Sequence, residues 1–301
     1  MKVLVIGGGG FLSGETIRMG LAAGHEVWAV SRGNKPLPAG AKAIKADRTQ
    51  REAFAAAIAA TGQTWDLAID GIGFNADDAK QDVAVLGERA KQLVFISTEM
   101  SLSPHSRPWR VDETYDRFDT APYGAGKRAA EEVLLGAKMS AAVTVLRPNH
   151  IYGPGSQLGC LPLHGRDPQL LEKLRKGEPM KLIGGGHFLQ QPVFVRDVAA
   201  MAYSVAGNGK TAGQIYFAAG PEVMASWHFY ATVAKLIGVG VTFEETSISE
   251  YLKANPNNAG FCCHRAYDMG KARAHGLKVP STPLETGLRE QIAWLDGMKT
   301  A

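Results

Sequence analysis

Cysteine is scarce in this sequence, because Cys160, Cys262 and Cys263 are the only three among 301 residues. An odd and sparse set cannot form the disulfide framework of a small secreted domain, so we expect a reducing compartment. His264 follows Cys262 and Cys263, but three consecutive residues cannot easily surround one ion, and no second ligand pair stands at a suitable spacing. The sequence therefore predicts no metal site.

Long apolar runs and blocks of like charge are also missing. No run approaches the ~20 residues that span a bilayer, and residues 1–6 reach a glycine cluster too early for a signal-peptide core. The 33 Lys and Arg and the 29 Asp and Glu residues leave a formal net charge of only +4, which no segment concentrates. We expect a cytoplasmic protein without a membrane partner that handles a small molecule rather than nucleic acid.

The first half of the chain shows a regular alternation of short β-rich runs with longer helical patterns. The predicted strands are residues 3–6, 27–31, 43–46, 67–70, 93–97 and 142–146, and the predicted helices are 11–23, 48–60, 83–90 and 123–135. Such alternation is typical of an α/β fold, a Rossmann-type doubly wound parallel sheet with crossover helices on both faces.

The pattern loosens after Pro148, where glycine and proline become frequent. Further predicted helices are 169–176, 227–237 and 283–294, and residues 193–195 and 214–217 are predicted as strands that rejoin the main sheet. We predict a dinucleotide-binding domain over residues 1–155, to which residues 190–218 return. Residues 156–301 then mainly form a smaller α/β substrate domain, interleaved with the first.

A glycine-rich turn, Gly7-Gly8-Gly9-Gly10-Phe11-Leu12-Ser13-Gly14, follows the first predicted strand and opens the first predicted helix. Such a turn lets backbone N–H groups reach a pyrophosphate, whose charge is favoured at a helix N-terminus. We expect Gly7, Gly10, Phe11 and Leu12 to contact a dinucleotide. A tight strand-to-helix turn without a ligand is the alternative.

The end of the second strand indicates which dinucleotide binds. A carboxylate there would bind the ribose 2′-hydroxyl of NAD, but the sequence has Ser31 and Arg32, which suit the 2′-phosphate of NADP. The cofactor is thus NADP or NAD, with NADP favoured. Asp47, after the third strand, is placed to meet the adenine amino group or to cap the following helix.

Tyr123 and Lys127 are spaced one helical turn apart, so both lie on one helix face. A nearby ammonium and a positive nicotinamide ring would lower the pKa of the phenol, which could then exchange a proton with a substrate hydroxyl. Thr98, at the carboxyl end of the fifth strand, could orient the reacting oxygen, with Ser97 as the alternative. An ordinary exposed pair is the alternative for Tyr123 and Lys127.

Several motifs occur together. They are Gly7-x-x-Gly10-x-x-Ser13, Phe95-Ile96-Ser97-Thr98, Pro122-Tyr123-Gly124-x-x-Lys127, Leu146-Arg147-Pro148-Asn149-x-Ile151-Tyr152-Gly153-Pro154-Gly155, Val195-Arg196-Asp197-Val198-Ala199, Tyr267-Asp268-x-x-Lys271-Ala272 and Leu284-Glu285-x-Gly287-Leu288. Together they resemble the extended short-chain dehydrogenase/reductase family, often called NAD-dependent epimerase/dehydratases. The resemblance implies a Rossmann domain, a smaller substrate domain and commonly a homodimer. It also implies Thr98, Tyr123 and Lys127 as the catalytic set, with Pro148, Asn149 and Ile151 beside the nicotinamide and substrate.

Two departures from the family narrow the chemistry. Sugar-nucleotide 4,6-dehydratases carry Asp and Glu after the catalytic Thr, whereas this chain has Glu99 and Met100, and a methionine can serve neither as base nor as acid. Many epimerases bind the substrate diphosphate with an arginine where this chain has Gln190, and the candidates to replace that arginine are Arg265 and Arg196. We expect Glu99, Met100, Asn149, His150, Gln190 and Arg265 to contact the substrate.

The function predicted from these residues is a nicotinamide-dependent epimerase or reductase that acts on a hydroxyl or keto carbon of a sugar or sugar nucleotide. The alternative is a non-catalytic dinucleotide-binding protein of the same fold, a redox sensor or an RNA-associated factor, since the segment around Ser31 and Arg32 is also similar to a branch with chloroplast RNA-binding members. The retention of Thr98, Tyr123 and Lys127 favours an enzyme. The sequence leaves open the choice between epimerase and reductase and the identity of the substrate.

Overall fold

The main sheet is buried on both faces, as the run of apolar residues in its first strand requires. The computed structural model describes residues 1–160 and 162–299. In strand β1 (Lys2–Ile6), Val3 and Val5 join one hydrophobic core, while Leu4 and Ile6 join the core on the opposite face. Because successive side chains of a strand point to opposite faces, an uninterrupted apolar strand needs a helical layer on each side.

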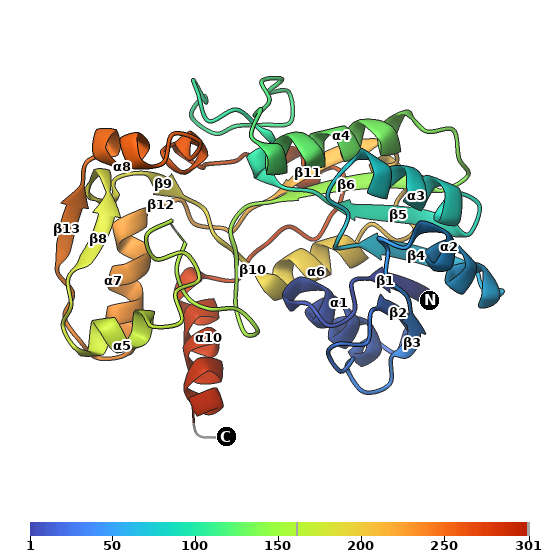
Figure 1. Cartoon of the computed structure of the whole chain (residues 1–301), viewed down its shortest axis with the longest axis horizontal. Coiled ribbons are helices and arrows are strands. Elements are labelled where there is room, and N and C mark those ends of the chain that lie inside the picture. Colours follow the sequence, from blue (N-terminus) through green and yellow to red (C-terminus); the bar gives the residue numbers. More distant parts are fainter. Residues whose placement is uncertain (161, 300–301) are drawn as a thin grey trace.

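Seven parallel strands form this sheet. Their order is β11 (Gln214–Ala218), β6 (Ala142–Pro148), β5 (Ala90–Ile96), β4 (Trp65–Asp70), β1, β2 (Glu26–Ser31) and β3 (Lys42–Lys45). Helices α1 (Phe11–Ala22) and α6 (Val195–Tyr203) cover one face, and α2 (Arg51–Ala60), α3 (Ala76–Leu86) and α4 (Pro122–Gly136) cover the other (Figure 1). The predicted doubly wound α/β fold is therefore confirmed.

The chain reverses its direction of winding between β1 and β4. It proceeds from β1 outward to β3, returns to β4 and continues to β6 on the other side. Gly7 N donates to Val30 O and Gly71 N donates to Ile6 O, so the turns that follow β1 and β4 lie side by side at the carboxyl end of the sheet. Ligands of open α/β sheets bind in the crevice at this reversal.

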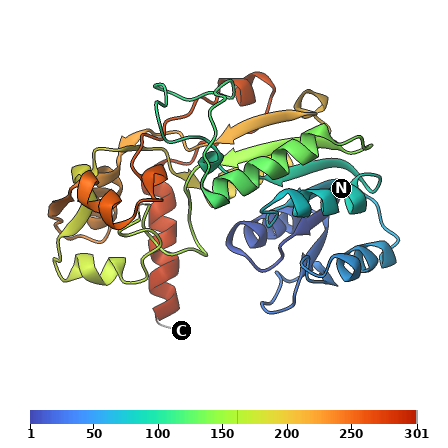
Figure 2. The same ribbon diagram turned by 45° about the horizontal axis from the view of Figure 1, so that its top comes forward.

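A smaller lobe lies beside the main sheet in both ribbon views (Figures 1 and 2). It contains α5 (Leu170–Arg175), β8 (Met180–Ile183), α7 (Ser226–Leu236), β13 (Phe243–Thr246), α8 (Ile248–Ala254) and α10 (Leu284–Lys299), with β8 and β13 paired in parallel. Its own core includes Leu182, Phe229 and Leu288. Two further strand pairs are short: β7 (Ile151–Tyr152) pairs with β10 (Val193–Phe194), and β9 (Leu189–Gln190) pairs with β12 (Met224–Ala225). Helix α9 (Gly270–Ala274) packs against β11 of the main sheet.

Two predicted elements are wrong in part. Residues 193–195 do not rejoin the main sheet, because Val193 and Phe194 pair only with β7 and Val195 already begins α6. The third helix begins earlier than predicted, since the side chain of Asn75 caps it by accepting hydrogen bonds from two backbone N–H groups. It also ends earlier, because Ala90 opens strand β5. Residues 214–217 do rejoin the sheet, beside β6, and the domain boundary near residue 155 stays a prediction.

Nothing in the helices that the structure describes has both the length and the apolar character that a membrane crossing requires.

Candidate functional site

The glycine turn forms a cradle of backbone amides at the start of α1. The N–H groups of Gly7 and Gly8 both donate to Val30 O at 3.0 Å, and Gly10 precedes α1 as its N-cap without any side-chain cap. Gly7 has a φ of +111°, and a Cβ there would lie 2.7 Å from Ile72 Cγ2, so this position requires glycine. The uncapped N–H groups of α1 can bind an anion.

A cavity of about 580 Å³ extends from this cradle along the carboxyl ends of β1, β2 and β3. Among the residues that line it are the predicted cofactor residues Gly7, Gly10, Ser31, Arg32 and Asp47, together with Phe74. The amide cradle, the size of the cavity and the exposed Arg32 side chain at its rim fit a dinucleotide.

Asp47 does not cap helix α2, contrary to one of the predicted alternatives. Its Oδ1 accepts hydrogen bonds from Thr49 N at 2.9 Å and Thr49 Oγ1 at 2.8 Å, while the N-cap of α2 is Gln50. These hydrogen bonds, followed by the positive charge of Arg32, lower the pKa of Asp47. Its carboxylate is thus ionised at the edge of the cavity, where a contact with the adenine amino group stays a prediction.

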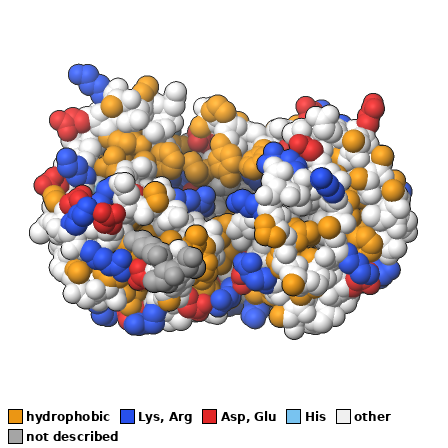
Figure 3. All heavy atoms as spheres, turned by 60° about the horizontal axis from the view of Figure 1, so that its bottom comes forward, with side chains coloured by type: hydrophobic (Ala, Val, Ile, Leu, Met, Phe, Trp, Pro, Cys, Tyr) orange, Lys and Arg blue, Asp and Glu red, His pale blue; other side chains and the backbone are white. Residues whose placement is uncertain are grey.

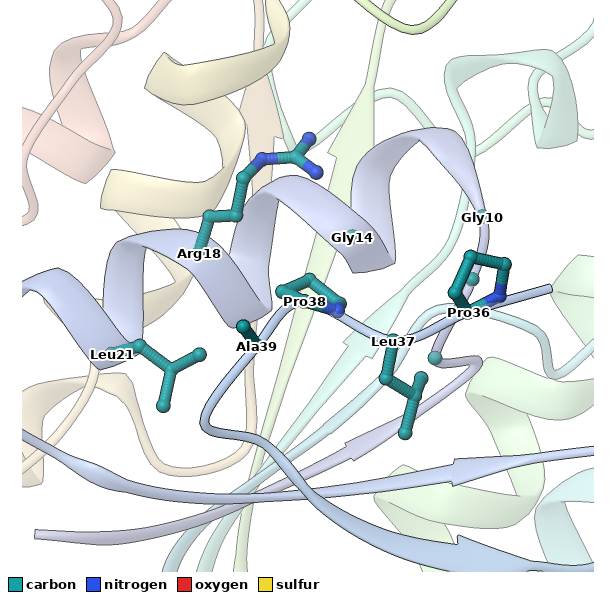
Figure 4. A pocket seen from close by; sticks show the side chains of 10 residues that line it. Gly10, Gly14, Arg18, Leu21, Pro36, Leu37, Pro38 and Ala39 are labelled. Atoms are coloured by element: carbon teal, nitrogen blue, oxygen red, sulfur yellow. The ribbon is translucent and has the colours of Figure 1, made fainter. Parts of the chain in front are cut away.

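A second hollow of about 440 Å³ adjoins the glycine turn on the outer side of α1. Figure 4 shows it between the helix, where Gly14, Arg18 and Leu21 lie, and the loop of residues 36–39. None of the predicted catalytic residues lines it, so we place the chemistry elsewhere.

The predicted catalytic and substrate residues line one further cavity of about 550 Å³. Some of the predicted cofactor residues line it as well. The predicted site residues in its lining are Phe11, Leu12, Thr98, Glu99, Met100, Tyr123, Lys127, Pro148, Asn149, His150, Ile151, Gln190 and Arg265. The space-filling view shows the molecule hollowed between its two lobes, with basic side chains in and beside the hollow (Figure 3). Phe74 lines both this reactive cavity and the dinucleotide cavity, so the two adjoin.

Tyr123 lies in the first turn of α4, after Pro122, which starts the helix. Its side chain is 46% exposed and, like that of Thr98, lines the reactive cavity. The pKa of Tyr123 is raised, because desolvation of the hydroxyl outweighs the effects of Thr98 and of the positive charge of Arg166, which both lower it. The phenol is therefore protonated at neutral pH in the protein chain by itself.

Lys127 is placed differently from the sequence expectation. Only 3% of it is exposed, its Nζ donates to Ile96 O at 2.6 Å, and the rings of Phe74 and Phe95 lie 5.0 Å from the ammonium. Burial lowers the pKa of Lys127 to about 8. In this arrangement the Lys127 ammonium is engaged by Ile96 O, and the pKa of Tyr123 is shifted by burial, Thr98, Arg166 and Glu99.

Glu99 holds a buried cluster of charges in the wall of the reactive cavity. Its Oε1 accepts from Arg265 Nε at 2.9 Å, and its Oε2 accepts from Arg107 Nη1 at 3.0 Å and from the Tyr267 hydroxyl at 2.5 Å. Burial alone would raise the pKa of Glu99, but the two arginines and the tyrosine lower it to about 2. Glu99 is thus ionised and fully engaged within the chain, which leaves it no role as a general base.

Polar groups from two other segments complete the wall. The Asn149 side chain is used internally, since Nδ2 donates to Gln191 O and Oδ1 accepts from His150 N. Burial and the nearby arginines lower the pKa of His150 to about 3, so its imidazole is neutral at physiological pH. Gln190 is 1% exposed, and its Nε2 has no hydrogen-bond partner among the described residues. This buried nitrogen is a donor whose hydrogen-bonding capacity the described residues leave unused.

The sequence analysis did not single out Arg107, Arg166 or Tyr267 as site residues. Tyr267 could have been found, because it stands in the C-terminal motif that carries the family resemblance. Arg107 lies in an irregular loop, and only the fold brings it to Glu99. Arg166 has a φ of +55° and lines the cavity from the glycine- and proline-rich segment, where no periodic pattern marks it.

Comparison with known proteins yields a family match and several relatives. The model of the NAD dependent epimerase/dehydratase family matches residues 3–219. A 2-alkyl-3-oxoalkanoate reductase of Stenotrophomonas maltophilia is 27% identical, over 96% of this chain and 98% of the relative. A chloroplast stem-loop binding protein of Arabidopsis thaliana is 23% identical, over 91% of this chain and 69% of the relative.

Solved structures share the fold. UDP-glucose 4-epimerase of Thermotoga maritima, determined with UDP-glucose, superposes with a TM-score of 0.80, with 99% of this chain and 100% of the epimerase covered. Its sequence is 19% identical. The similarity at this level establishes the architecture of sheet and smaller lobe.

Proposed function

The chain belongs to the NAD dependent epimerase/dehydratase family, and from this premise we propose that it reduces a ketone, or oxidises the matching secondary alcohol, with a nicotinamide dinucleotide. The observation that carries the proposal is the position of Thr98, Tyr123 and Lys127 in one cavity, which adjoins the glycine cradle. The reductase from Stenotrophomonas, matched over nearly its whole length, supports redox chemistry at a keto carbon.

The bound nicotinamide would accept or supply the hydride. Tyr123 handles the proton: its raised pKa keeps the hydroxyl protonated at neutral pH, so it can donate that proton to the oxygen of a ketone. Thr98, which lines the same cavity as Tyr123, can bind the same substrate oxygen and fix its direction. Protonation by Tyr123 suits the reductive direction, and we therefore propose a reductase in preference to an epimerase.

Lys127 stabilises the anion that remains on Tyr123 after proton transfer. Its ammonium lies one helical turn along α4 and, with a pKa of about 8, is charged at neutral pH. A contact between Lys127 and the nicotinamide ribose of a bound cofactor would draw Nζ away from Ile96 O. Met100 offers neither acid nor base, which argues against dehydration.

We propose NADP as the preferred dinucleotide. Arg32 is exposed at the rim of the cofactor cavity, and in the described part of the chain it forms no ion pair. A 2′-phosphate would supply its counter-charge, with Ser31 as a second donor. For the substrate, the sequence favours a sugar or sugar nucleotide, whereas the Stenotrophomonas relative is an oxoalkanoate reductase.

The substitution Tyr123→Phe tests the proposal. It removes only the hydroxyl, so turnover should fall about 10²- to 10⁴-fold, while the Kd for NADPH, measured by the change in its fluorescence, stays within twofold of the parent. Oxidation of NADPH should be followed with a ketose, a UDP-sugar and an oxo acid. A Phe variant as active as the parent would exclude Tyr123 as the proton donor and favour a non-catalytic dinucleotide-binding or RNA-associated protein.

A further inference from the structure

We propose that Gln190 and Arg265 form a subsite for a single carboxylate, so that the ketone reduced beside Tyr123 belongs to an oxo acid. This inference rests on the proposed function and adds the class of substrate to it. Both side chains line the reactive cavity, and both are almost completely buried.

The charges in this wall do not balance within the chain. Glu99 contributes one negative charge, while Arg107 and Arg265 contribute two positive charges, and Tyr267 remains neutral because its pKa is raised well above the usual value. Asp119 is a further carboxylate near this cluster, but in the described part of the chain it forms no ion pair with either arginine. A buried excess positive charge is costly, so the site favours an anion from outside.

The backbone holds Gln190 next to Arg265. Arg265 N donates to Leu189 O at 2.8 Å, which fixes the strand that carries Gln190 against the segment that carries Arg265. Arg265 uses Nε for Glu99 and Nη2 for Gly260 O, and the described residues provide no hydrogen-bond partner for Nη1. Nη1 can therefore donate to a ligand in the cavity, and the buried, unpartnered Gln190 Nε2 gains a partner when the Gln190 amide turns toward that ligand.

The subsite lies close to the reactive group. Arg265 Nε is 2.9 Å from the carboxylate of Glu99, and Glu99 directly follows Thr98 in the chain. Gln190, Arg265, Thr98 and Tyr123 line the same cavity, so one small molecule can occupy the subsite and the reactive centre together. Arg166, exposed at the same cavity, can attract an anion toward it.

The same charges argue against a phosphate. The buried cluster of Glu99, Arg107 and Arg265 has one excess positive charge, which a monoanionic carboxylate balances, whereas the charge of Arg166 is exposed to solvent. A dianion would be placed beside the ionised carboxylate of Glu99, whose pKa is about 2. Gln190, unlike an arginine at that position, donates a hydrogen bond but contributes no charge toward a diphosphate.

Binding can be measured without turnover in the Tyr123→Phe variant loaded with NADPH. The probes are acetoacetate, its neutral analogues methyl acetoacetate and acetoacetamide, and dihydroxyacetone phosphate as a dianionic ketone. Acetoacetate should bind at least tenfold more tightly than either neutral analogue, which corresponds to about 1.4 kcal/mol, and more tightly than the phosphate. The parental enzyme should oxidise NADPH with acetoacetate.

The substitution Gln190→Glu then adds a negative charge within the subsite. It should weaken the binding of acetoacetate at least tenfold and leave the Kd for methyl acetoacetate within twofold. Unchanged binding of NADPH shows that the variant is folded. Gln169→Glu, at an exposed position outside the cavity, adds the same charge as a matched control and should change neither Kd.

Three results would overturn the subsite: no binding of acetoacetate, equal binding of acid and ester, or equal weakening of both by Gln190→Glu. Tighter binding of dihydroxyacetone phosphate would also overturn it, by assigning the site to a phosphate. If acetoacetate binds selectively but the parental enzyme does not oxidise NADPH with it or with any other ketone tested, the subsite stands and the proposed reductase function fails.

Discussion

Replacing Lys127 with methionine should make the protein more stable at neutral pH while it removes activity. Methionine keeps the length of the side chain, and the rings of Phe74 and Phe95, 5.0 Å from the ammonium, offer it an apolar environment. The parental lysine is charged at pH 7 although only 3% of it is exposed. A group whose removal stabilises the fold but abolishes function is kept for its chemistry.

The magnitude follows from the pKa. Its decrease from 10.5 to about 8 means that the folded state disfavours the ammonium by about 3 kcal/mol relative to the neutral amine. Loss of the hydrogen bond from Nζ to Ile96 O offsets about 1 kcal/mol of this. Lys127→Met should therefore raise the free energy of unfolding by about 2 kcal/mol at pH 7, and Tm by roughly 4 °C.

The advantage of the variant should vanish at high pH. Below pH 8 both the folded and the unfolded parent carry the proton and the full penalty applies, whereas between pH 8 and 10.5 only the unfolded state keeps it. The parent therefore gains stability over that interval and Lys127→Met does not. Urea unfolding of both proteins without cofactor, at pH 7 and pH 9.5, measures the difference between their free energies of unfolding. Groups that titrate in the same way in both proteins cancel from this difference.

Two results would refute this reasoning. One is a methionine variant that is less stable than the parent at pH 7, which would mean that the hydrogen bond and the aromatic contacts outweigh the burial of charge. The other is a stability difference independent of pH, which would mean that the pKa of Lys127 is not lowered.

Two further predictions concern Arg32 in the dinucleotide cavity and Gly71 in the reactive cavity. Arg32→Glu should weaken NADPH at least tenfold relative to NADH, because a carboxylate repels the 2′-phosphate and accepts from a 2′-hydroxyl; an unchanged ratio of the two Kd values, measured by fluorescence, would contradict the role of Arg32. Gly71→Ala should destabilise the protein by about 1–3 kcal/mol, because a Cβ there would lie 2.7 Å from Ser13 Oγ. Ser13→Gly should relieve this contact, and a double-mutant cycle in urea that shows no coupling would contradict it.

Local patterns were sufficient to predict the large parallel sheet. Buried strands such as Val3–Ile6 read as uninterrupted apolar runs, and the helices between them, such as the one that begins at Phe11, have regular spacing and clear ends. The smaller lobe was harder to predict, because its strand pairs β7–β10 and β9–β12 have only two residues per strand. Their stability comes from partners distant in sequence, and a two-residue strand has no period.

The sequence by itself determined that a glycine turn opens the first helix. It also determined that Thr98 follows the end of the fifth strand and that Tyr123 and Lys127 lie in the first turns of the helix after it. It also supplied the residue types that reductive chemistry requires. These features depend on contacts within one or two adjacent elements, where spacing alone carries the information.

Only the tertiary structure decided the electrostatics of the site. It buried Lys127 between two aromatic rings and brought Arg107 and Arg265 to Glu99 from positions 8 and 166 residues away along the chain. It also left Gln190 buried without a partner among the described residues. The pKa values and charge balance of a cavity are sums over all the groups that surround it, and no sequence pattern records which distant groups those are.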